Sequence, residues 1–168
     1  ATIGGNGTGT VTISGTAADL FNNPLPTGTA VLLDSNGIEL ATVAIANGLF
    51  EFNGLAAGSY YVLIRNNSGL VDVLYPNAPC PAGACNITAV GTPIVLPAAR
   101  SRQSIQATAS IDLRLPEGRE ISGRVTRGAQ PLAGVTVYVY NSAGSVVATG
   151  VSDALGDYVT SGGLPAGA

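Results

Sequence analysis

The chain repeats one sequence pattern with a period of about 108 residues, and this repeat limits the folds that it can adopt. The first copy runs from Ile13-Ser14-Gly15 to Gly54-Leu55-Ala56-Ala57-Gly58, and the second from Ile121-Ser122-Gly123 to Gly163-Leu164-Pro165-Ala166-Gly167. In the first copy Gly58 is followed by a strand-like run, Ser59 to Ile64, whereas Gly167 is followed only by Ala168. We therefore expect two similar modules, the second without at least its last strands. Either the chain was cut there or another chain supplies the missing part.

Short stretches of alternating apolar and polar residues predict strands, because side chains of a strand point to opposite faces in turn. The clearest case is Gln103 to Leu115, where every second residue from Ile105 onward is apolar. Turn signals separate such stretches every eight to twelve residues; one of them, Asn36-Gly37, favours a type I′ hairpin turn. No segment has a convincing helical pattern. Many short strands with regular turns predict an all-β fold of sandwich type.

The composition excludes several functional classes. Charged residues make up only 10% of the chain, against about a quarter in an average protein, and the net charge of −3 gives no electrostatic basis for nucleic-acid binding. The chain has no His and no Lys, so triads that use either residue as a base are excluded, as are Lys–Asn and Lys–Asp isopeptide bonds. No apolar run reaches the length of a membrane span. We expect a protein that is not an enzyme.

The only two cysteines, Cys80 and Cys85, lie five positions apart in a Pro- and Gly-containing segment. Zinc needs about four ligands, and the chain offers no His to complete a site with two cysteines. A local disulfide is the favoured interpretation, and it places the protein in an oxidising, extracellular or cell-surface setting. A pair of reduced, structural cysteines is the alternative. Because the closed loop is short, the disulfide should stabilise the fold only modestly.

The second copy resembles the carboxypeptidase regulatory-like family of transthyretin-like (prealbumin-like) β-sandwich repeats, which occur in secreted and surface proteins of bacteria. The resemblance rests on Ile121-Ser122-Gly123-Arg124-Val125, Pro131 to Val137, Asp153 to Tyr158 and Gly163 to Gly167, and it is weaker in the first copy. It implies tandem Ig-like or transthyretin-like modules with a structural, spacer or adhesive role. The family name does not imply peptidase activity. The expected organisation is a flexible lead-in or donor strand over residues 1–9, a first module with a Cys-loop insert over 10–116, and a partial second module over 117–168.

Two acidic residues of one predicted turn, Asp153 and Asp157, are candidate ligands for a Ca²⁺ ion. Ca²⁺ takes six to eight oxygen ligands, and two carboxylates in one turn supply too few of them. The alternative is an Asx turn, in which Asp153 accepts hydrogen bonds from nearby backbone amides. No other cofactor is expected.

Tyr138 and Tyr140 share one face of a predicted strand and could form a platform for a glycan. The alternative is that this face belongs to the core or to a contact between modules.

The pattern as a whole favours a structural protein, a repeat subunit of an extracellular filament, stalk or surface array that self-associates head to tail. An open sandwich exposes unpaired strand edges, which a strand from a neighbour can complete. The predicted donor is the N-terminal segment, with Ile3 and Val11 as anchors. The alternatives are a spacer or adhesin fragment of a larger secreted protein, with further repeats in the same chain, and a carbohydrate-binding module.

Overall fold

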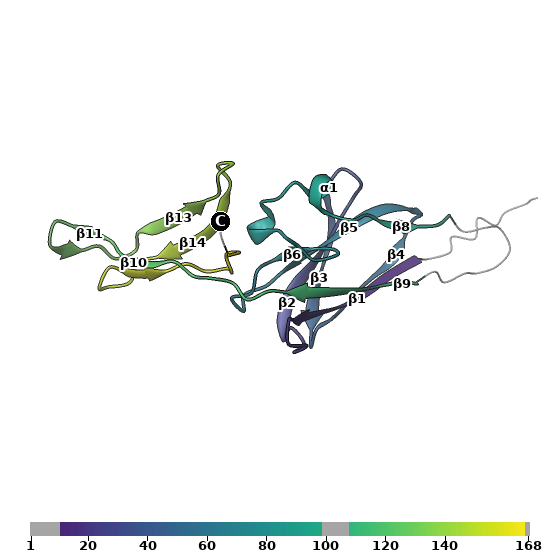
Figure 1. Cartoon of the computed structure of the whole chain (residues 1–168), viewed down its shortest axis with the longest axis horizontal. Coiled ribbons are helices and arrows are strands. Elements are labelled where there is room, and N and C mark those ends of the chain that lie inside the picture. Colours follow the sequence, from purple (N-terminus) through teal and green to yellow (C-terminus); the bar gives the residue numbers. More distant parts are fainter. Residues whose placement is uncertain (1–10, 99–107, 167–168) are drawn as a thin grey trace, which may run out of the picture.

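The computed structural model describes residues 11–98 and 108–166, and it shows the predicted all-β fold of tandem β-sandwich type. Two β units lie end to end along the long axis of the molecule (Figure 1). We call the described residues between 11 and 115 unit 1, residues 116–121 the linker, and residues 122–166 unit 2. In Figure 1 unit 1 occupies the right part of the view and unit 2 the left part.

Unit 1 is a curled sheet in which β1 lies between β4, its antiparallel partner, and β9, its parallel partner. The hydrogen-bonded order is β7-β6-β5-β2-β3-β4-β1-β9, and β8 pairs with β5. The elements are β1 (Val11–Asp19), β2 (Thr27–Leu33), β3 (Glu39–Ala46), β4 (Leu49–Leu55), β5 (Gly58–Arg65), β6 (Val73–Leu74), β7 (Ala78–Pro79), η1 (Pro81–Gly83), α1 (Ile87–Val90), β8 (Ile94–Leu96) and β9 (Thr108–Leu115).

The core of unit 1 follows from the alternation along its strands. In β9, Ile111, Leu113 and Leu115 are buried while the residues between them face outward, as the period of two predicts. In the central strands β2 and β5 both faces are covered over four consecutive residues, Ala30 to Leu33 and Tyr61 to Ile64, and these stretches are continuous apolar runs. The main cluster consists of Val11, Ile13, Ala17, Leu25, Ala30, Leu32, Ile45, Phe50, Phe52, Val62, Ile64, Val73, Ile94, Leu96, Ile111, Leu113 and Leu115.

Unit 2 repeats the register of two strand pairs of unit 1, β1–β4 and β2–β3. It contains β10 (Ser122–Arg124), β11 (Thr126–Arg127), β12 (Gln130–Pro131), β13 (Thr136–Tyr140), β14 (Val146–Val151) and β15 (Asp157–Val159). The β1–β4 pair Gly15↔Phe50 recurs as the β10–β15 pair Gly123↔Tyr158. The β2–β3 ladder recurs as β13–β14, and its irregularity between Leu32 and Leu33 recurs between Val139 and Tyr140. The sequence repeat is therefore also a repeat of strand register.

The predicted type I′ turn is present, but at a different Asn-Gly pair. Asn47 and Gly48 both have positive φ, 50° and 77°, and join β3 directly to β4. At the predicted position only Gly37 has positive φ. There the Asp34 side chain accepts hydrogen bonds from the amides of Asn36 and Ile38, and this local bonding forms a longer loop.

The expectation that the chain lacks helices was wrong in a small way, because the 3₁₀ turn η1 and, after it, the α-helical turn α1 form between β7 and β8. The side chain of Asn86 caps it by accepting a hydrogen bond from the amide of Ala89. No helix within residues 11–98 and 108–166 is long and apolar enough to cross a membrane. The first part of the predicted strand from Gln103 lies outside the described residues, and β9 begins at Thr108.

Candidate functional site

The two units meet through backbone hydrogen bonds rather than through a free linker. Leu70 of unit 1 and Glu117 form an antiparallel bridge, and the amide of Gly118 donates to the carbonyl oxygen of Gly69 at 3.0 Å. On the side of unit 2, Arg119 and Leu164 exchange two backbone hydrogen bonds of 2.9 and 3.0 Å. The turn after β5, the linker and the turn after β15 are thus joined in succession.

Two glycines allow this close approach. A Cβ added to Gly163 would lie 2.4 Å from the carbonyl carbon of Leu70 and 2.6 Å from the carbonyl oxygen of Gly69. A Cβ added to Gly118 would lie 2.0 Å from the Cα of Gly163. Since the obstructing atoms belong to the backbone, they cannot rotate away, and larger residues do not fit at either position.

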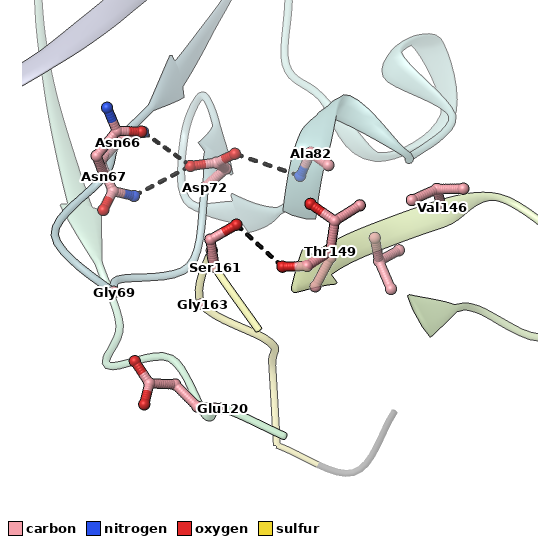
Figure 2. A pocket seen from close by; sticks show the side chains of 13 residues that line it. Asn66, Asn67, Gly69, Asp72, Ala82, Glu120, Val146, Thr149, Ser161 and Gly163 are labelled. Carbon is pink, nitrogen blue, oxygen red and sulfur yellow. Dashed lines mark hydrogen bonds between the residues drawn. The ribbon is translucent and has the colours of Figure 1, made fainter. Parts of the chain in front are cut away.

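A half-buried carboxylate, that of Asp72, fixes the turn of unit 1 that receives unit 2. Asp72 accepts hydrogen bonds from the amide and the side-chain Nδ2 of Asn66, each 3.0 Å long, and from the amide of Ala82 at 3.2 Å (Figure 2). Asn66 also donates to the carbonyl oxygen of Leu70 at 2.9 Å. Burial raises the pKa of Asp72 above its ordinary value of 3.8, although its hydrogen bonds from Asn66 and Ala82 oppose this shift. Asp72 therefore connects the Gly69–Leu70 turn to the Cys loop.

Cys80 and Cys85 form the predicted disulfide, and the loop that it closes contacts unit 2. Cys80 is fully buried in the second hydrophobic cluster of unit 1. Ala84, in the same loop, packs against the small core of unit 2, which consists of Val147, Ala148 and Leu164. The disulfide loop is therefore part of the contact surface between the units.

A cavity of about 480 Å³ lies at the junction, and Figure 2 shows its lining. Unit 1 contributes Asn66 and Asp72, unit 2 contributes Thr149 and Ser161, and Glu120 of the linker completes the rim. Ser161 donates its hydroxyl to the carbonyl oxygen of Thr149 at 3.1 Å. In the part of the chain that the structure describes, no three His, Cys, Asp or Glu side chains come together as metal ligands. The geometry of the junction holds the two units together.

A second candidate surface is the outer edge of β13. In unit 1 the corresponding strand β2 pairs with β3 on one side and with β5 on the other, from Thr29↔Arg65 to Leu33↔Tyr61. In unit 2, β13 pairs with β14, and within residues 11–98 and 108–166 no strand occupies its other edge. This edge presents unpaired N–H and C=O groups, which favour the addition of a strand.

Tyr138 and Tyr140 lie on this strand and are 53% and 59% exposed. Their ring centroids are 6.4 Å apart, and the ring planes are tilted by 40°. Among the described residues, neither tyrosine belongs to a hydrophobic core cluster. The two rings thus form a small aromatic surface beside the open edge.

The two candidate Ca²⁺ ligands have protein partners. Asp153 accepts hydrogen bonds from the amides of Leu155 and Asp157, which is the predicted Asx turn. Asp157 accepts two hydrogen bonds from the Arg124 guanidinium, at 2.6 and 2.9 Å. These bonds lower the pKa of Asp157 below its ordinary value of 3.8 and raise that of Arg124. The structure thus has an Asx turn at Asp153 and an ion pair between Asp157 and Arg124.

Of the two predicted anchors of the N-terminal donor strand, Val11 and Ile3, the structure describes only Val11. Val11 is the first residue of β1, pairs with Leu55 and is only 3% exposed in the core of its own unit. The prediction that Val11 anchors a donor strand is therefore incompatible with this arrangement, because its side chain is already buried. Ile3 lies outside the described residues.

The junction itself was not predicted from the sequence. Gly69, Gly118 and Gly163 were not distinguished from other turn glycines, because their role depends on contacts between residues about 45 or more positions apart. Asp72 offered a partial signal, since it is an acidic residue within an otherwise apolar run.

No known protein family matches this sequence, and no curated protein matches it either. Among solved structures, the chain is similar to the Bacillus anthracis TIE protein, with 15% identity and a TM-score of 0.46 over 90% of this chain. It is also similar to a streptococcal ancillary pilin, with 13% identity and a TM-score of 0.44 over 93% of this chain. The chain spans 27% of the first of these proteins and 51% of the second.

Proposed function

We propose that the chain is a non-enzymatic structural protein whose β units stack into a stiff extracellular or cell-surface filament, stalk or array. The observation that carries this proposal is the junction, where two units of the same register are joined by backbone hydrogen bonds and close glycine packing. The close contact at the junction leaves little room for one unit to rotate against the next, so a stack of such units is stiff. The disulfide supports an extracellular setting.

The finer proposal concerns assembly between chains. The open edge of β13 accepts an antiparallel strand from a neighbour, as β2 accepts β5 in unit 1. The N-terminal segment of the next subunit, residues 1–9 with Ile3 as its apolar anchor, is the proposed donor. A head-to-tail contact of this type does not close on itself, so it builds a filament. The alternative source of the strand is a further repeat in a longer chain, in which case the units are spacers or part of an adhesin.

Deletion of residues 1–9 tests strand donation between subunits. We expect the wild-type chain to form polymers visible by electron microscopy and the deleted chain to remain as single subunits. Circular dichroism serves as the control, because the deletion ends before β1 and should leave the β spectrum unchanged. Polymers of unchanged length from the deleted chain would exclude this donor.

A second candidate function is glycan binding at Tyr138 and Tyr140, favoured by their exposure and by the 6.4 Å separation of their rings. Aromatic faces on a rigid strand can stack on the apolar face of a sugar ring. A glycan-array signal that Tyr138→Ala removes and Val151→Ala retains would support this function. Absence of any signal for the wild-type chain would exclude it over the glycans tested.

A further inference from the structure

We propose that the surface of unit 1 that corresponds in strand register to the junction surface of unit 2 is a docking surface for the Cys-loop end of another unit of the same type. This head surface consists of Leu40 to Thr42 on β3 and Asn53 to Leu55 at the end of β4. The proposal relies on stacking as the mode of assembly, but not on the strand donation proposed above.

The repeat identifies the surface by direct comparison. The matching ladders place Leu40, Ala41 and Thr42 at the same positions as Val147, Ala148 and Thr149. Val147 is 6% exposed and Ala148 5%, because they face the disulfide loop of unit 1 across the junction. Leu40 is 53% exposed, and Ala41 and Thr42 are exposed as well. Residues that the junction buries in one copy of the fold are thus uncovered in the other.

The neighbouring turn shows the same contrast. Gly163, which precedes Leu164, packs against the backbone of Leu70. Gly54, which precedes the equivalent Leu55, has open space around it. A Cβ built on Gly163 would lie 2.4 Å from Leu70, and one built on Gly54 would meet no atom within 4 Å. Thr12 donates its hydroxyl to the side-chain oxygen of Asn53 at 2.9 Å and holds this turn beside β1.

The docking partner that we propose for the head surface is the part of unit 1 that contacts the equivalent surface of unit 2. That partner is the Gly69–Leu70 turn, which is supported by Asp72, together with the loop closed by the disulfide. Its contacting atoms are apolar side chains and backbone carbonyls, which suit Leu40 and Ala41. At the rim of the head surface, Glu39 already pairs with Arg65 at 3.7 Å, so docking does not require an unpaired charge to be buried there.

Direct binding tests the proposal. The probe is a fragment of residues 1–116 carrying Leu40→Glu, which has a free Cys-loop end and a blocked head surface. Both hydrophobic clusters of unit 1 contain no residue beyond Leu115, so the fragment retains its complete core. A second probe is the full chain carrying Leu40→Glu and Gly163→Val, in which the clash with Leu70 displaces unit 2 from the Cys-loop end. Each probe is titrated into the isotope-labelled full chain and followed by the amide signals.

The expected result is a saturable shift of the amide signals of Leu40 to Thr42 and Asn53 to Leu55, at probe concentrations up to about 1 mM. Leu40→Glu in the labelled chain should raise the dissociation constant about tenfold or more, because a carboxylate would have to lose its water on docking. Leu155→Glu, at a 64% exposed leucine of unit 2, is the matched control and should bind as the wild type does.

No saturable shift with either probe, or equal binding by Leu40→Glu and the wild type, would overturn the proposal. The test is separate from that of the proposed function. Absence of probe binding by a chain that does form filaments would refute the docking surface alone, because unit 2 covers the Cys-loop end of unit 1 in the full chain. Probe binding by a chain that never forms filaments would refute the filament and leave the surface in place.

Discussion

Gly163→Ala should open the junction without unfolding either unit. The added methyl group would lie 2.4 and 2.5 Å from the carbonyl carbon and oxygen of Leu70 and 2.6 Å from the carbonyl oxygen of Gly69. Contacts between carbon atoms are normally 3.5–4.0 Å, so the Gly69–Leu70 turn and the loop after β15 must separate by roughly 1 Å. The bond from the Gly118 amide to Gly69, now 3.0 Å, would then lengthen or break.

The free-energy cost of Gly163→Ala at the junction depends on whether the crowded atoms can move away, and here they belong to the backbone. Overpacking against atoms that cannot rotate away costs about 1–3 kcal/mol. Each 1.4 kcal/mol is a factor of about ten in an equilibrium constant, so the population of the open junction should rise about 5- to 150-fold. The stability of unit 1 should remain nearly unchanged, because its two core clusters contain no residue of unit 2.

Amide hydrogen exchange measures this opening directly. The Gly118 amide should exchange about 5- to 150-fold faster in Gly163→Ala, whereas the Cys80 amide, bonded to Asp72 within unit 1, should exchange at the wild-type rate. Gly58→Ala is the matched control, since its Cβ would meet atoms no closer than 3.6 Å. Gly118 exchange within about twofold of the wild-type rate would refute the inference of a tight junction.

Three further predictions concern the disulfide, the carboxyl groups and the core. Replacing Cys80 and Cys85 together with Ser should lower the free energy of unfolding by about 2 kcal/mol, measured by urea denaturation; an unchanged midpoint would contradict this value. In a carboxyl NMR titration Asp72 should titrate above 3.8 and Asp157 below it. The stability that Asp72 contributes is therefore present below pH 3.8 and is lost as the pH rises through its raised pKa. The stability that Asp157 contributes is instead lost as the pH falls through its lowered pKa. The reverse order of titration would contradict the burial of Asp72 and the ion pair of Asp157. Leu113→Ala, at a fully buried position of β9, should cost about 2–5 kcal/mol, and a loss below about 1 kcal/mol would show that the β1–β9 pairing is not part of the core.

The strands and the repeat could be predicted from the sequence because both depend on local patterns. The period-two alternation of Ile111, Leu113 and Leu115 placed these residues on one buried face. The equal spacing of matching segments predicted two similar units, and the ladders of unit 1 and unit 2 share the same register. The turn type at Asn36-Gly37 was wrong because the Asp34 side chain bonds the backbone there, and the dipeptide alone does not contain this information.

The junction could not be predicted, because it depends on residues that are distant in sequence. Gly118 and Gly163 are separated by 45 positions, and nothing in either segment indicates that their backbones touch. The disulfide between Cys80 and Cys85 was predicted from spacing, but not the contact of its loop with Val147 and Ala148. Val11 was predicted to be an anchor for a neighbour, and its alternation with Ile13 in fact reflects burial in its own unit.

Electron microscopy of native, unheated material, combined with the intact mass of the same sample, tests the central claim most directly. The account predicts filaments of end-to-end stacked β units built from chains of about 16.7 kDa. Monodisperse single particles of that mass, at all concentrations up to the solubility limit, would contradict it.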